Sequence, residues 1–243
     1  MALTYLTYLK TDRFPTPWCP GCGNGLVVKA TCRAIERLGI PKRNTIVVSG
    51  IGCSGRAAGF FDLDSVHTAH GRAVPVAEGI KGANPKLRVL ILSGDGDLLG
   101  IGGNHLLHAA RRNTDIKIIC FNNEIYGMTG GQKSPTTPLR TLTLTSPQGN
   151  TARPINAQAI VKAHGGFFAR STTYHLSHLE QCIVAAIEHE GLSFVDARTH
   201  CIVNNGRRLG FKDAHEMLMQ FKNTFSRNDG AAALSDTEIG ITQ

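Results

Sequence analysis

The sequence has no apolar run long enough to cross a membrane. Among its 243 residues, no stretch approaches the roughly 20 consecutive apolar residues that a transmembrane helix requires. Met1–Lys10 is too short and too polar for a secretory signal, and no cleavage site follows it. We therefore expect a cytoplasmic protein with no membrane partner.

Low-complexity tracts and internal repeats are also missing. Apolar residues make up 42% of the chain and charged residues 18%, which excludes disorder as the main state because enough apolar surface exists to offset chain entropy. The net charge is +8, but the basic residues form only short doublets without interleaved aromatic residues. We expect no nucleic-acid partner, and an acidic protein or an anionic small molecule suits the positive charge better.

The seven cysteines do not form a disulfide framework, since their number is odd and the expected compartment is reducing. Only Cys19 and Cys22 make a close pair, and a single CxxC is compatible with zinc, a cluster, a redox dithiol or chance. No second CxxC or HxxxH is present, so further ligands must come from distant positions. Cys53 and Cys201 are the candidates, because each follows a predicted strand. The other three cysteines fall within predicted helices or strands and are expected to be small buried residues: Cys32, Cys120 and Cys182.

Short β-branched segments alternate with amphipathic ones, which predicts a doubly wound, mostly parallel α/β sheet. The expected strands are 45–49, 87–93, 116–121, 194–197 and, more weakly, 167–171. The expected helices are 24–38, capped by Asn24 and stopped by Gly39, and then 74–82, 104–112, 156–164 and 176–190. The chain is predicted to divide into an N-terminal arm with the CxxC (1–23), the α/β domain (24–205), and a C-terminal extension (206–243) that ends in a loosely held tail from residue 229. Residues 128–153 are expected to form a long functional loop.

Two consecutive predicted strands end in oxygen-bearing side chains. Asp95 lies in Gly94-Asp95-Gly96-Asp97, and Asn123 lies in Asn122-Asn123-Glu124-Ile125. Since ligands bind at the carboxyl ends of parallel strands, neighbouring strands would bring Asp95 and Asn123 together. A carboxylate, an amide oxygen and a backbone carbonyl suit Mg²⁺, which completes its octahedron with phosphate and water. Gly94 and Gly96 are expected to leave room for a diphosphate.

These segments resemble the β subunits of the 2-oxoacid:ferredoxin oxidoreductases, which bind thiamine diphosphate. The resemblance covers about residues 15 to 210 and rests on three runs: HGRAVPVAEGIKGANP, GDGDLLGIGGNHLLHAARRN and NNEIYGMTGGQKSPTTP. It implies a thiamine diphosphate-binding fold, here the diphosphate-binding module. The second run and the SPTTP segment look most like 2-oxoglutarate-type members.

The resemblance also assigns roles to single residues. Mg²⁺ would be held by Asp95, by Asn123 and by the carbonyl of Ile125, and a [4Fe–4S] cluster by Cys19, Cys22, Cys53 and Cys201. His70 and Arg56 would act at the reacting centre, with Arg56 gripping a substrate carboxylate. The cofactor would contact the following positions: Ile51, Gly52, Cys53, Ser54, His70, Gly71, Arg72, Ala73, Gly96, Asp97, Gly127 and Met128. His200, beside Cys201, is an alternative ligand.

By this resemblance, the protein takes part in the oxidative decarboxylation of a 2-oxoacid to an acyl-CoA and CO₂, with electrons leaving through the cluster to ferredoxin. The chain holds one diphosphate-binding module, so an α subunit must supply the module that binds the aminopyrimidine. Two alternatives stay open. One is a non-redox thiamine diphosphate-dependent decarboxylase or transketolase-like subunit with structural zinc, and the other is a zinc-stapled basic module that binds nucleic acid.

Overall fold

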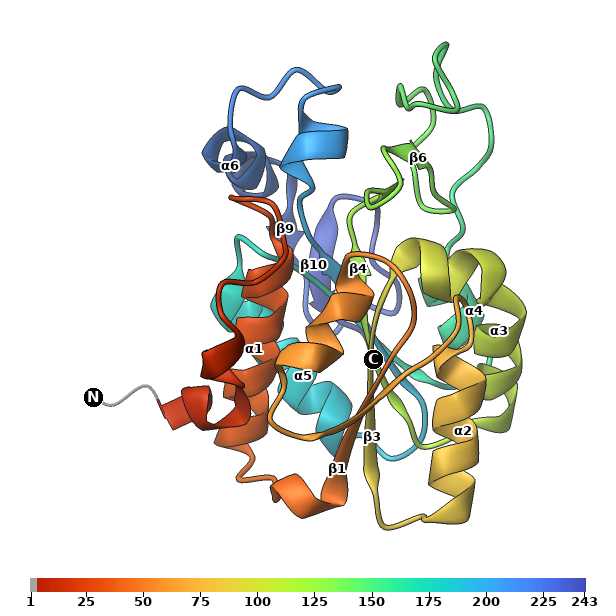
Figure 1. The fold of residues 1–243 in the computed structure, drawn as a ribbon. Helices are drawn as coiled ribbons and strands as arrows, with labels where there is room; N and C mark the ends of the chain where they lie inside the picture. The colour runs from red at the N-terminus through yellow and green to blue at the C-terminus, as the bar shows by residue number, and fades with distance from the viewer. Residues whose placement is uncertain (1–3) are drawn as a thin grey trace.

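The computed structural model describes residues 4–243, which are built around one eight-stranded sheet (Figure 1). The strand order is β2-β1-β3-β4-β8-β7-β10-β9, and every pairing is parallel except β10 against β7. The strands are β1 (Thr45–Ser49), β2 (Asp64–His67), β3 (Arg88–Gly94), β4 (Lys117–Asn122), β7 (Phe167–Thr172), β8 (Ser193–Arg198), β9 (Ser226–Arg227) and β10 (Glu238–Ile241). The predicted doubly wound, mostly parallel sheet is confirmed, and all five expected strands are present.

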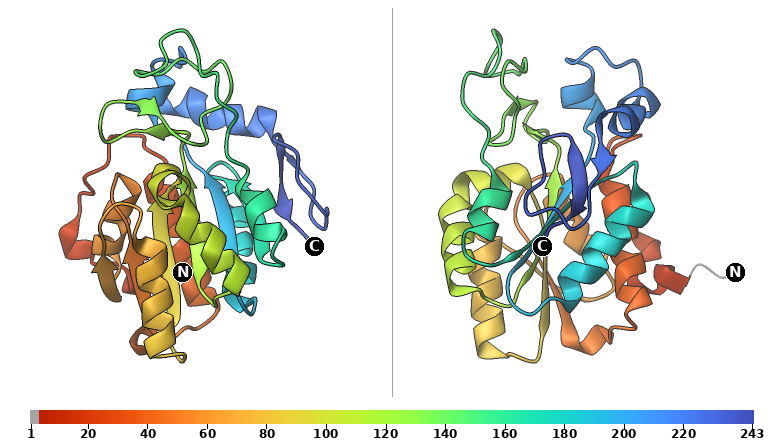
Figure 2. Two further views of the ribbon diagram at one scale, coloured as in Figure 1. Left: turned by 90° about the vertical axis from the view of Figure 1, so that its right-hand side faces the viewer. Right: turned by 180° about the vertical axis from the view of Figure 1, so that it is seen from behind.

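Helices cover both faces of the sheet, because strands buried on two sides need apolar cover on each (Figures 1 and 2). On one face lie α1 (Asn24–Arg37) and α5 (Leu176–Glu188), whose apolar residues join one buried cluster with Val47, Leu90 and Phe121. On the other face lie α2 (Ala73–Ala83), α3 (Gly103–Arg112) and α4 (Ala157–Lys162), which pack over a second cluster with Ile91 and Phe194. All five expected helices are confirmed, with no end shifted by more than two residues.

The start of α1 differs from the prediction. Gly23, not Asn24, precedes the helix, and it is pressed against the chain after β8: a β-carbon there would lie 2.3 Å from Thr199 Oγ1. The Asn24 side chain is 1% exposed and, within residues 4–243, neither of its amide atoms has a hydrogen-bond partner. The predicted cap is therefore wrong, because contact with the distant Thr199 segment fixes where the helix begins.

The predicted loose tail is also wrong. Within residues 229–243, strand β10 pairs with the edge of β7, and Leu234 and Ile239 are buried. Arg170 donates from β7 to the carbonyl of Ser235 at 2.7 Å. The segment carries too few apolar residues to signal a strand by itself, and the exposed edge of β7 supplies the partner that orders it.

Two segments rise above the carboxyl edge of the sheet (Figures 1 and 2). One is the predicted long loop 128–153, which holds only the two-residue strand β6 (Gln132–Lys133), paired with β5 (Ile125–Tyr126). The other runs from a helical turn at Ile202–Gly206 to α6 (Ala214–Thr224), a helix that the sequence analysis did not predict. Both segments border the end of the sheet at which Asp95 and Asn123 lie.

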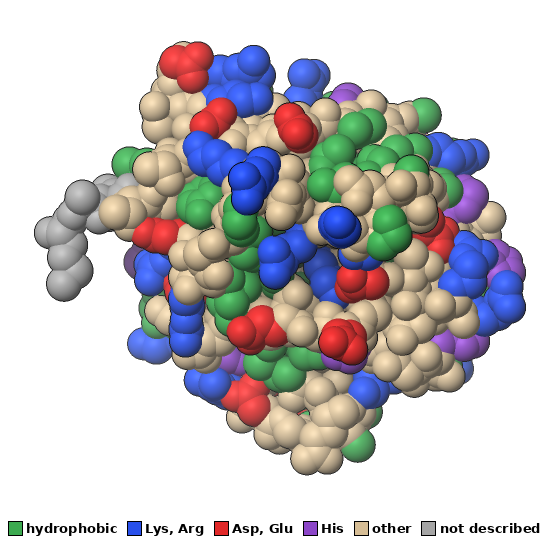
Figure 3. Space-filling view, turned by 90° about the horizontal axis from the view of Figure 1, so that it is seen from below, with side chains coloured by type: hydrophobic (Ala, Val, Ile, Leu, Met, Phe, Trp, Pro, Cys, Tyr) green, Lys and Arg blue, Asp and Glu red, His purple; other side chains and the backbone are tan. Residues whose placement is uncertain are grey.

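The opposite end of the sheet shows acidic and basic side chains interspersed, with no surface of a single charge (Figure 3). A shallow cavity of about 270 Å³ there is lined by residues of both signs, among them Lys81, Arg88, Asp115 and Glu188. No helix among residues 4–243 has the length and apolar character needed to span a bilayer.

Candidate functional site at the carboxyl edge of the sheet

Asp95 and Asn123 lie side by side at the tips of β3 and β4. The two strands are neighbours, with Gly94 opposite Phe121, so the residues that follow them leave the sheet together. The backbone N–H of Asn123 donates to the Asp95 carboxylate, and Thr136 Oγ1 donates to Asp95 Oδ2 at 2.6 Å. The strand order thus produces the convergence that the sequence predicts.

The Asp95 carboxylate is suited to a cation. It is 2% exposed and, in the part of the chain that the structure describes, forms no ion pair with a Lys, Arg or His. Burial raises the pKa of Asp95, against the hydrogen bonds that it accepts from Ser134 and Thr136. A buried carboxylate without a positive partner is costly, and a divalent ion would remove that cost.

The chain after β4 has an unusual backbone conformation at Glu124, whose φ is 61°. This left-handed conformation costs free energy for a residue with a β-carbon, so it needs external support. Thr137 Oγ1 donates to the Glu124 carbonyl at 2.6 Å, and the Glu124 carboxylate pairs with Arg198. The carbonyl and the carboxylate of Glu124 are therefore both bound, and together they hold the loop that carries Asn123 and Ile125.

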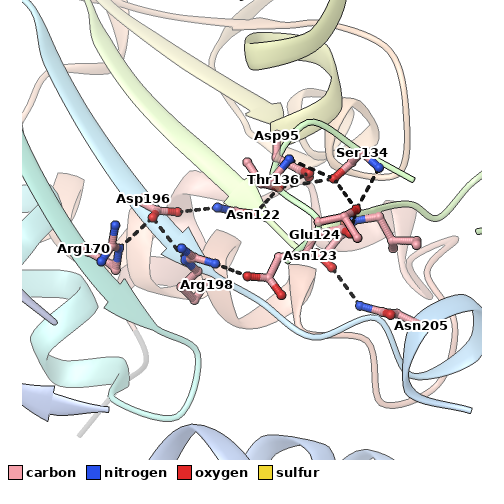
Figure 4. A network of polar contacts seen from close by, with 12 residues as sticks. Asp95, Asn122, Asn123, Glu124, Ser134, Thr136, Arg170, Asp196, Arg198 and Asn205 are labelled. Carbon is pink, nitrogen blue, oxygen red and sulfur yellow. Dashed lines mark hydrogen bonds and ion pairs between the residues drawn. The ribbon is translucent and has the colours of Figure 1, made fainter. Parts of the chain in front are cut away.

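A buried network anchors Arg198 in turn (Figure 4). Asp196 lies between Arg170 and Arg198, with N···O distances of 2.8 and 3.1 Å, and also accepts from Asn122 Nδ2 at 2.9 Å. Burial by itself raises the pKa of Asp196, but the two guanidinium groups outweigh it and the net pKa is lowered. The network joins the ends of β4, β7 and β8 beneath the Glu124 loop.

Asp97 organises the loops around the predicted cofactor position. Its Oδ1 accepts the backbone N–H groups of Ile51 at 3.1 Å and Gly71 at 2.8 Å, and lies 2.5 Å from His70 Nδ1. Its Oδ2 accepts from Ser93 at 2.8 Å. From the family resemblance, Asp97 is expected to line the diphosphate. In the structure the Asp97 carboxylate instead accepts hydrogen bonds from the protein itself, and these bonds hold the 51 and 70–71 segments beside β3.

The glycines of the GDGD segment face protein atoms. A β-carbon on Gly96 would lie 2.2 Å from Cε1 of Tyr126, and one on Gly94 would lie 2.8 Å from Ser54 Oγ. The Tyr126 hydroxyl donates to the Gly96 carbonyl at 3.1 Å, and its ring meets the His70 ring edge-on at 6.3 Å between centroids. Close packing of these side chains, and not only room for a diphosphate, therefore requires glycine at both positions.

The four predicted cluster ligands come together at the same edge. Burial, together with the nearby thiols of Cys201, Cys53 and Cys19, raises the pKa of Cys22 to about 12. Burial also raises the pKa of Cys53 and of Cys201, and neighbouring thiols add to both, while the charge of Arg56 opposes the shift at Cys53. The four thiols disfavour one another's ionisation. Bound metal cations would offset this effect, because they stabilise the ionised thiolates.

These thiols are not spaced for one ion. Within residues 4–243, no three His, Cys, Asp or Glu side chains are arranged to hold a single metal ion. A tetrahedral zinc site requires its sulfur ligands about 2.3 Å from one centre. Within the described residues, the four thiols therefore lie near one another without forming a tetrahedral single-ion site.

The CxxC arm is fastened to its distant partners by two contacts. Trp18 Nε1 donates to the Cys53 carbonyl at 2.7 Å, and the Gly23 N–H donates to the His200 carbonyl at 3.0 Å. His200 is 3% exposed, and its Nδ1 lies 3.1 Å from Thr173 Oγ1. The ring is therefore packed in the protein interior beside Cys201.

The other predicted residues surround this edge with different exposures. Arg56 and Arg72 are exposed, and Ile51 and Met128 are 39% and 46% exposed. Ser54 and Ala73 are buried, and Gly52 has a φ of 120° that favours glycine. Cys32, Cys120 and Cys182 are fully buried, which confirms their expected structural character.

A cavity of about 800 Å³ adjoins the Glu124 loop, between the two raised segments. Its lining combines apolar side chains such as Phe221 and Leu234 with Arg198. Thr199 Oγ1 and Asn205 Oδ1 also belong to the lining residues, and neither atom has a hydrogen-bond partner within residues 4–243. The cavity therefore has apolar and charged side chains in its walls.

Comparison with known proteins identifies the fold. Residues 47–197 match the family model of the thiamine pyrophosphate enzyme, C-terminal TPP binding domain. The chain is 43% identical to 2-oxoglutarate synthase subunit KorB of Archaeoglobus fulgidus, over 99% of this chain and 89% of that protein. It is 45% identical to the 2-oxoacid:ferredoxin oxidoreductase subunit beta of Saccharolobus solfataricus, over 77% of this chain and 63% of that one.

The chain belongs to the β subunits of the 2-oxoacid:ferredoxin oxidoreductases. A solved structure agrees: the 2-oxoglutarate:ferredoxin oxidoreductase from Magnetococcus marinus, with 2-oxoglutarate, coenzyme A and succinyl-CoA bound, superimposes with a TM-score of 0.85 at 30% identity, over 98% of this chain and 82% of that one. The predicted family, fold and oxidoreductase class are confirmed, and thiamine diphosphate is the cofactor of the matched domain. The matched family is not that of a zinc-stapled nucleic-acid-binding module.

Several residues of this oxidoreductase subunit that shape the site were not singled out from the sequence. Thr136 hydrogen bonds to Asp95, and Tyr126 packs against Gly96. Trp18 hydrogen bonds to the carbonyl of Cys53, and Arg198 forms an ion pair with Glu124. Their partners are distant in sequence, so no local spacing reveals them. Two of these residues, Tyr126 and Thr136, lie in the run NNEIYGMTGGQKSPTTP that carries the family resemblance, but its SPTTP segment indicated only 2-oxoglutarate-type members.

Proposed function

We propose that this β subunit binds Mg²⁺ and the diphosphate of thiamine diphosphate at the tips of β3 and β4, and ligates a [4Fe–4S] cluster beside them. The observation that carries the proposal is the meeting of both sets of groups at one sheet edge, where Asp95 contacts Asn123 and the four thiols perturb one another. Short separation between the two centres is what electron transfer requires.

Asp95, the Asn123 side chain and the Ile125 carbonyl are the proposed Mg²⁺ ligands, because they supply three hard oxygens. Gly96, Gly127 and Met128 border the diphosphate, and Ile51, Gly71 and Ala73 border the rest of the cofactor. Asp97 holds Ile51 and Gly71 in place and fixes the His70 ring through Nδ1. A ring fixed in this way can move a proton through its other nitrogen at the reacting centre.

Cys19, Cys22, Cys53 and Cys201 are the proposed cluster ligands. Cys53 serves both sites, because the residues around it, Gly52 and Ser54, lie in the loop that Asp97 attaches to β3. When bound, thiamine diphosphate supplies the electron sink for carbon–carbon cleavage, and the cluster exports single electrons. The exposed Arg56 guanidinium binds a substrate carboxylate.

The proposed reaction converts 2-oxoglutarate and CoA to succinyl-CoA and CO₂, with ferredoxin as the electron acceptor. The ligands of the Magnetococcus marinus enzyme support this substrate. The net charge of +8 suits an acidic electron acceptor. An α subunit supplies the aminopyrimidine-binding module, since the domain matched over residues 47–197 is the C-terminal TPP binding domain of a thiamine pyrophosphate enzyme.

The test uses the complex of this chain with its α subunit, purified anaerobically. We expect about four irons per β chain, stoichiometric thiamine diphosphate, and 2-oxoglutarate-dependent reduction of ferredoxin that requires CoA. Asp95→Ala should abolish Mg²⁺-dependent retention of thiamine diphosphate and leave the iron content unchanged. A colourless complex with stoichiometric zinc, or full cofactor occupancy in Asp95→Ala, would refute the assignment. Greater activity with pyruvate or branched-chain 2-oxoacids would refute the substrate.

The alternative of a non-redox thiamine diphosphate enzyme with structural zinc is disfavoured. The relatives named above are 2-oxoacid oxidoreductases or 2-oxoglutarate synthases, and no single-ion arrangement of cysteines occurs among residues 4–243.

A further inference from the structure

A short segment, residues 207–212, joins the turn after Cys201 to helix α6. The turn closes on Cys201, whose carbonyl accepts the backbone N–H of Gly206 at 2.8 Å. At the other end, Ala214 begins α6 and packs on the Cys19–Cys22 loop: a β-carbon on Gly21 would lie 2.4 Å from Ala214 Cβ (Figures 1 and 2). The 207–212 segment therefore runs from one pair of predicted cluster ligands to another.

The four cysteines differ in their access to solvent. Cys19 is exposed, whereas Cys22, Cys53 and Cys201 are partly buried. The indole of the residue before Cys19 donates to the Cys53 carbonyl at 2.7 Å, which ties the two segments together. The solvent-facing side of this group of cysteines is therefore the Cys19–Cys22 loop, on which the start of α6 packs.

The 207–212 segment is positively charged. Residues 201–212 include Arg207, Arg208 and Lys212 and no acidic residue. All three are exposed, and none forms an ion pair within residues 4–243. The next acidic residues face the start of α6: Asp213 accepts the N–H of Glu216 at 2.8 Å, and Glu216 accepts that of Lys212 at 2.7 Å. Three exposed cations without a partner attract an acidic one.

Backbone hydrogen bonds give the segment a defined shape. The N–H of Leu209 donates to the Asn205 carbonyl at 3.1 Å. The N–H of Phe211 donates to the Gly206 carbonyl at 3.0 Å. Leu209 is 43% exposed and lies among the three cations in the sequence. An apolar side chain within a charged rim is typical of protein–protein contact surfaces, and the charges steer the encounter of the partners.

We propose that residues 207–212, together with the adjoining Cys19–Cys22 loop, form the docking surface for the acidic electron acceptor. This inference rests on the proposed function, which assigns the four cysteines to a cluster and ferredoxin to the acceptor. A second copy of this chain is a poor occupant, because a symmetric contact would place the same cations against one another. An acceptor bound here lies next to Cys19, so its separation from the cluster is short.

The experiment compares the wild-type α–β complex with Arg207→Gln/Arg208→Gln, both purified anaerobically. The Kd of an acidic ferredoxin is measured calorimetrically at low and high salt. Turnover with 2-oxoglutarate and CoA is measured with ferredoxin and with methyl viologen, a small cationic dye that needs no basic docking surface. We expect Kd and KM for ferredoxin to rise about five- to tenfold at low salt, and kcat and the dye rate to stay within about twofold. The salt dependence of Kd should become shallower, since fewer charges attract the partner.

Arg111→Gln/Arg112→Gln is the matched control, because it removes the same charge from the end of α3, which precedes the start of β4 at the opposite end of the sheet. It should leave Kd for ferredoxin within about twofold of the wild-type value. Arg207→Gln/Lys212→Gln should weaken binding as the first variant does, and it spares the contact of Arg208 Nη2 with the Gly130 carbonyl at 3.4 Å.

The outcomes separate the docking surface from the proposed function. Unchanged ferredoxin affinity in both 207–212 variants, or an equal loss in the control, overturns the docking surface. Loss of the α subunit from these variants in size-exclusion chromatography would assign the segment to the subunit interface and also overturn it. Both results leave the proposed function intact. A wild-type complex that lacks the cluster or does not reduce ferredoxin overturns the proposed function, and the inference with it.

Discussion

A β-carbon on Gly127 would lie 3.2 Å from the sulfur of Cys201. Gly127 belongs to the loop after β4, and Cys201 follows β8, the neighbouring strand of the sheet. The proposed diphosphate-binding loop and the proposed cluster ligand are therefore in direct contact. In this β subunit the two proposed centres would therefore share packing as well as an edge of the sheet.

Gly127→Ala should disturb the cluster without abolishing folding, because the new methyl group requires Cys201 Sγ to move by a few tenths of an ångström. We expect an altered electron paramagnetic resonance spectrum of the reduced cluster and iron loss to a chelator that is several-fold faster. Gly79→Ala is the control, since no atom lies within 4 Å of its β-carbon position in α2. It should stabilise the chain by about 0.5–1 kcal/mol and leave the spectrum unchanged.

Cys22→Ser should remove the cluster and retain a measurable fraction of thiamine diphosphate, because Cys22 lies on the arm and not on the loops that surround Asp95. Iron analysis and cofactor release after heat denaturation measure the two quantities. Cys182→Ser changes a fully buried thiol of α5 and should keep the iron. Ferredoxin reduction by Cys22→Ser at the wild-type rate would rule out Cys22 as a ligand.

Arg198→Met should lower the free energy of unfolding by about 3–5 kcal/mol, because it leaves the buried Asp196 with one cation and Glu124 with none. Denaturant titration of the complex measures this loss. The control is Arg112→Met, which breaks the ion pair to Glu78 at the surface and should cost about 0–1 kcal/mol. Similar losses of unfolding free energy in the two variants would show that the buried network stabilises the fold no more than the surface ion pair does.

Acidification should destabilise the protein partly through His178. Burial lowers the pKa of His178 below its usual 6.5, although Asp229 opposes the shift. A histidine with a lowered pKa binds its proton more readily in the unfolded chain. Its contribution is therefore complete above pH 6.5 and is lost as the pH falls below that value.

The melting temperature should consequently fall between pH 7.5 and 5.5, and His178→Asn should reduce the fall. Asparagine can keep the contact to Ser171 Oγ, which lies 2.9 Å from His178 Nδ1. The exposed His108 gives the control variant His108→Asn, which should leave the pH dependence unchanged. An equal pH dependence in wild type and His178→Asn would eliminate this residue as a source of acid sensitivity.

Local sequence patterns were enough to predict the strands, most helices and the two strand-end motifs. Those features depend on local periodicity and on motifs a few residues long, such as Gly94–Asp97 and Asn122–Ile125. The sequence also predicted that Asp95 and Asn123 would meet, because consecutive parallel strands place their carboxyl ends together. The residues implied by family resemblance were found at the same edge.

The contacts that hold those residues in place join segments far apart in the chain and are visible only once it is folded. Asp97 binds loops at 51 and 70–71, Arg198 supports the left-handed Glu124, and Asn205 contacts Asn123, a residue far away in the chain. The β10 segment becomes a strand only because the edge of β7 offers it hydrogen bonds. Such contacts depend on which strands become neighbours, and no local pattern of side chains encodes a partner that lies 82 residues away.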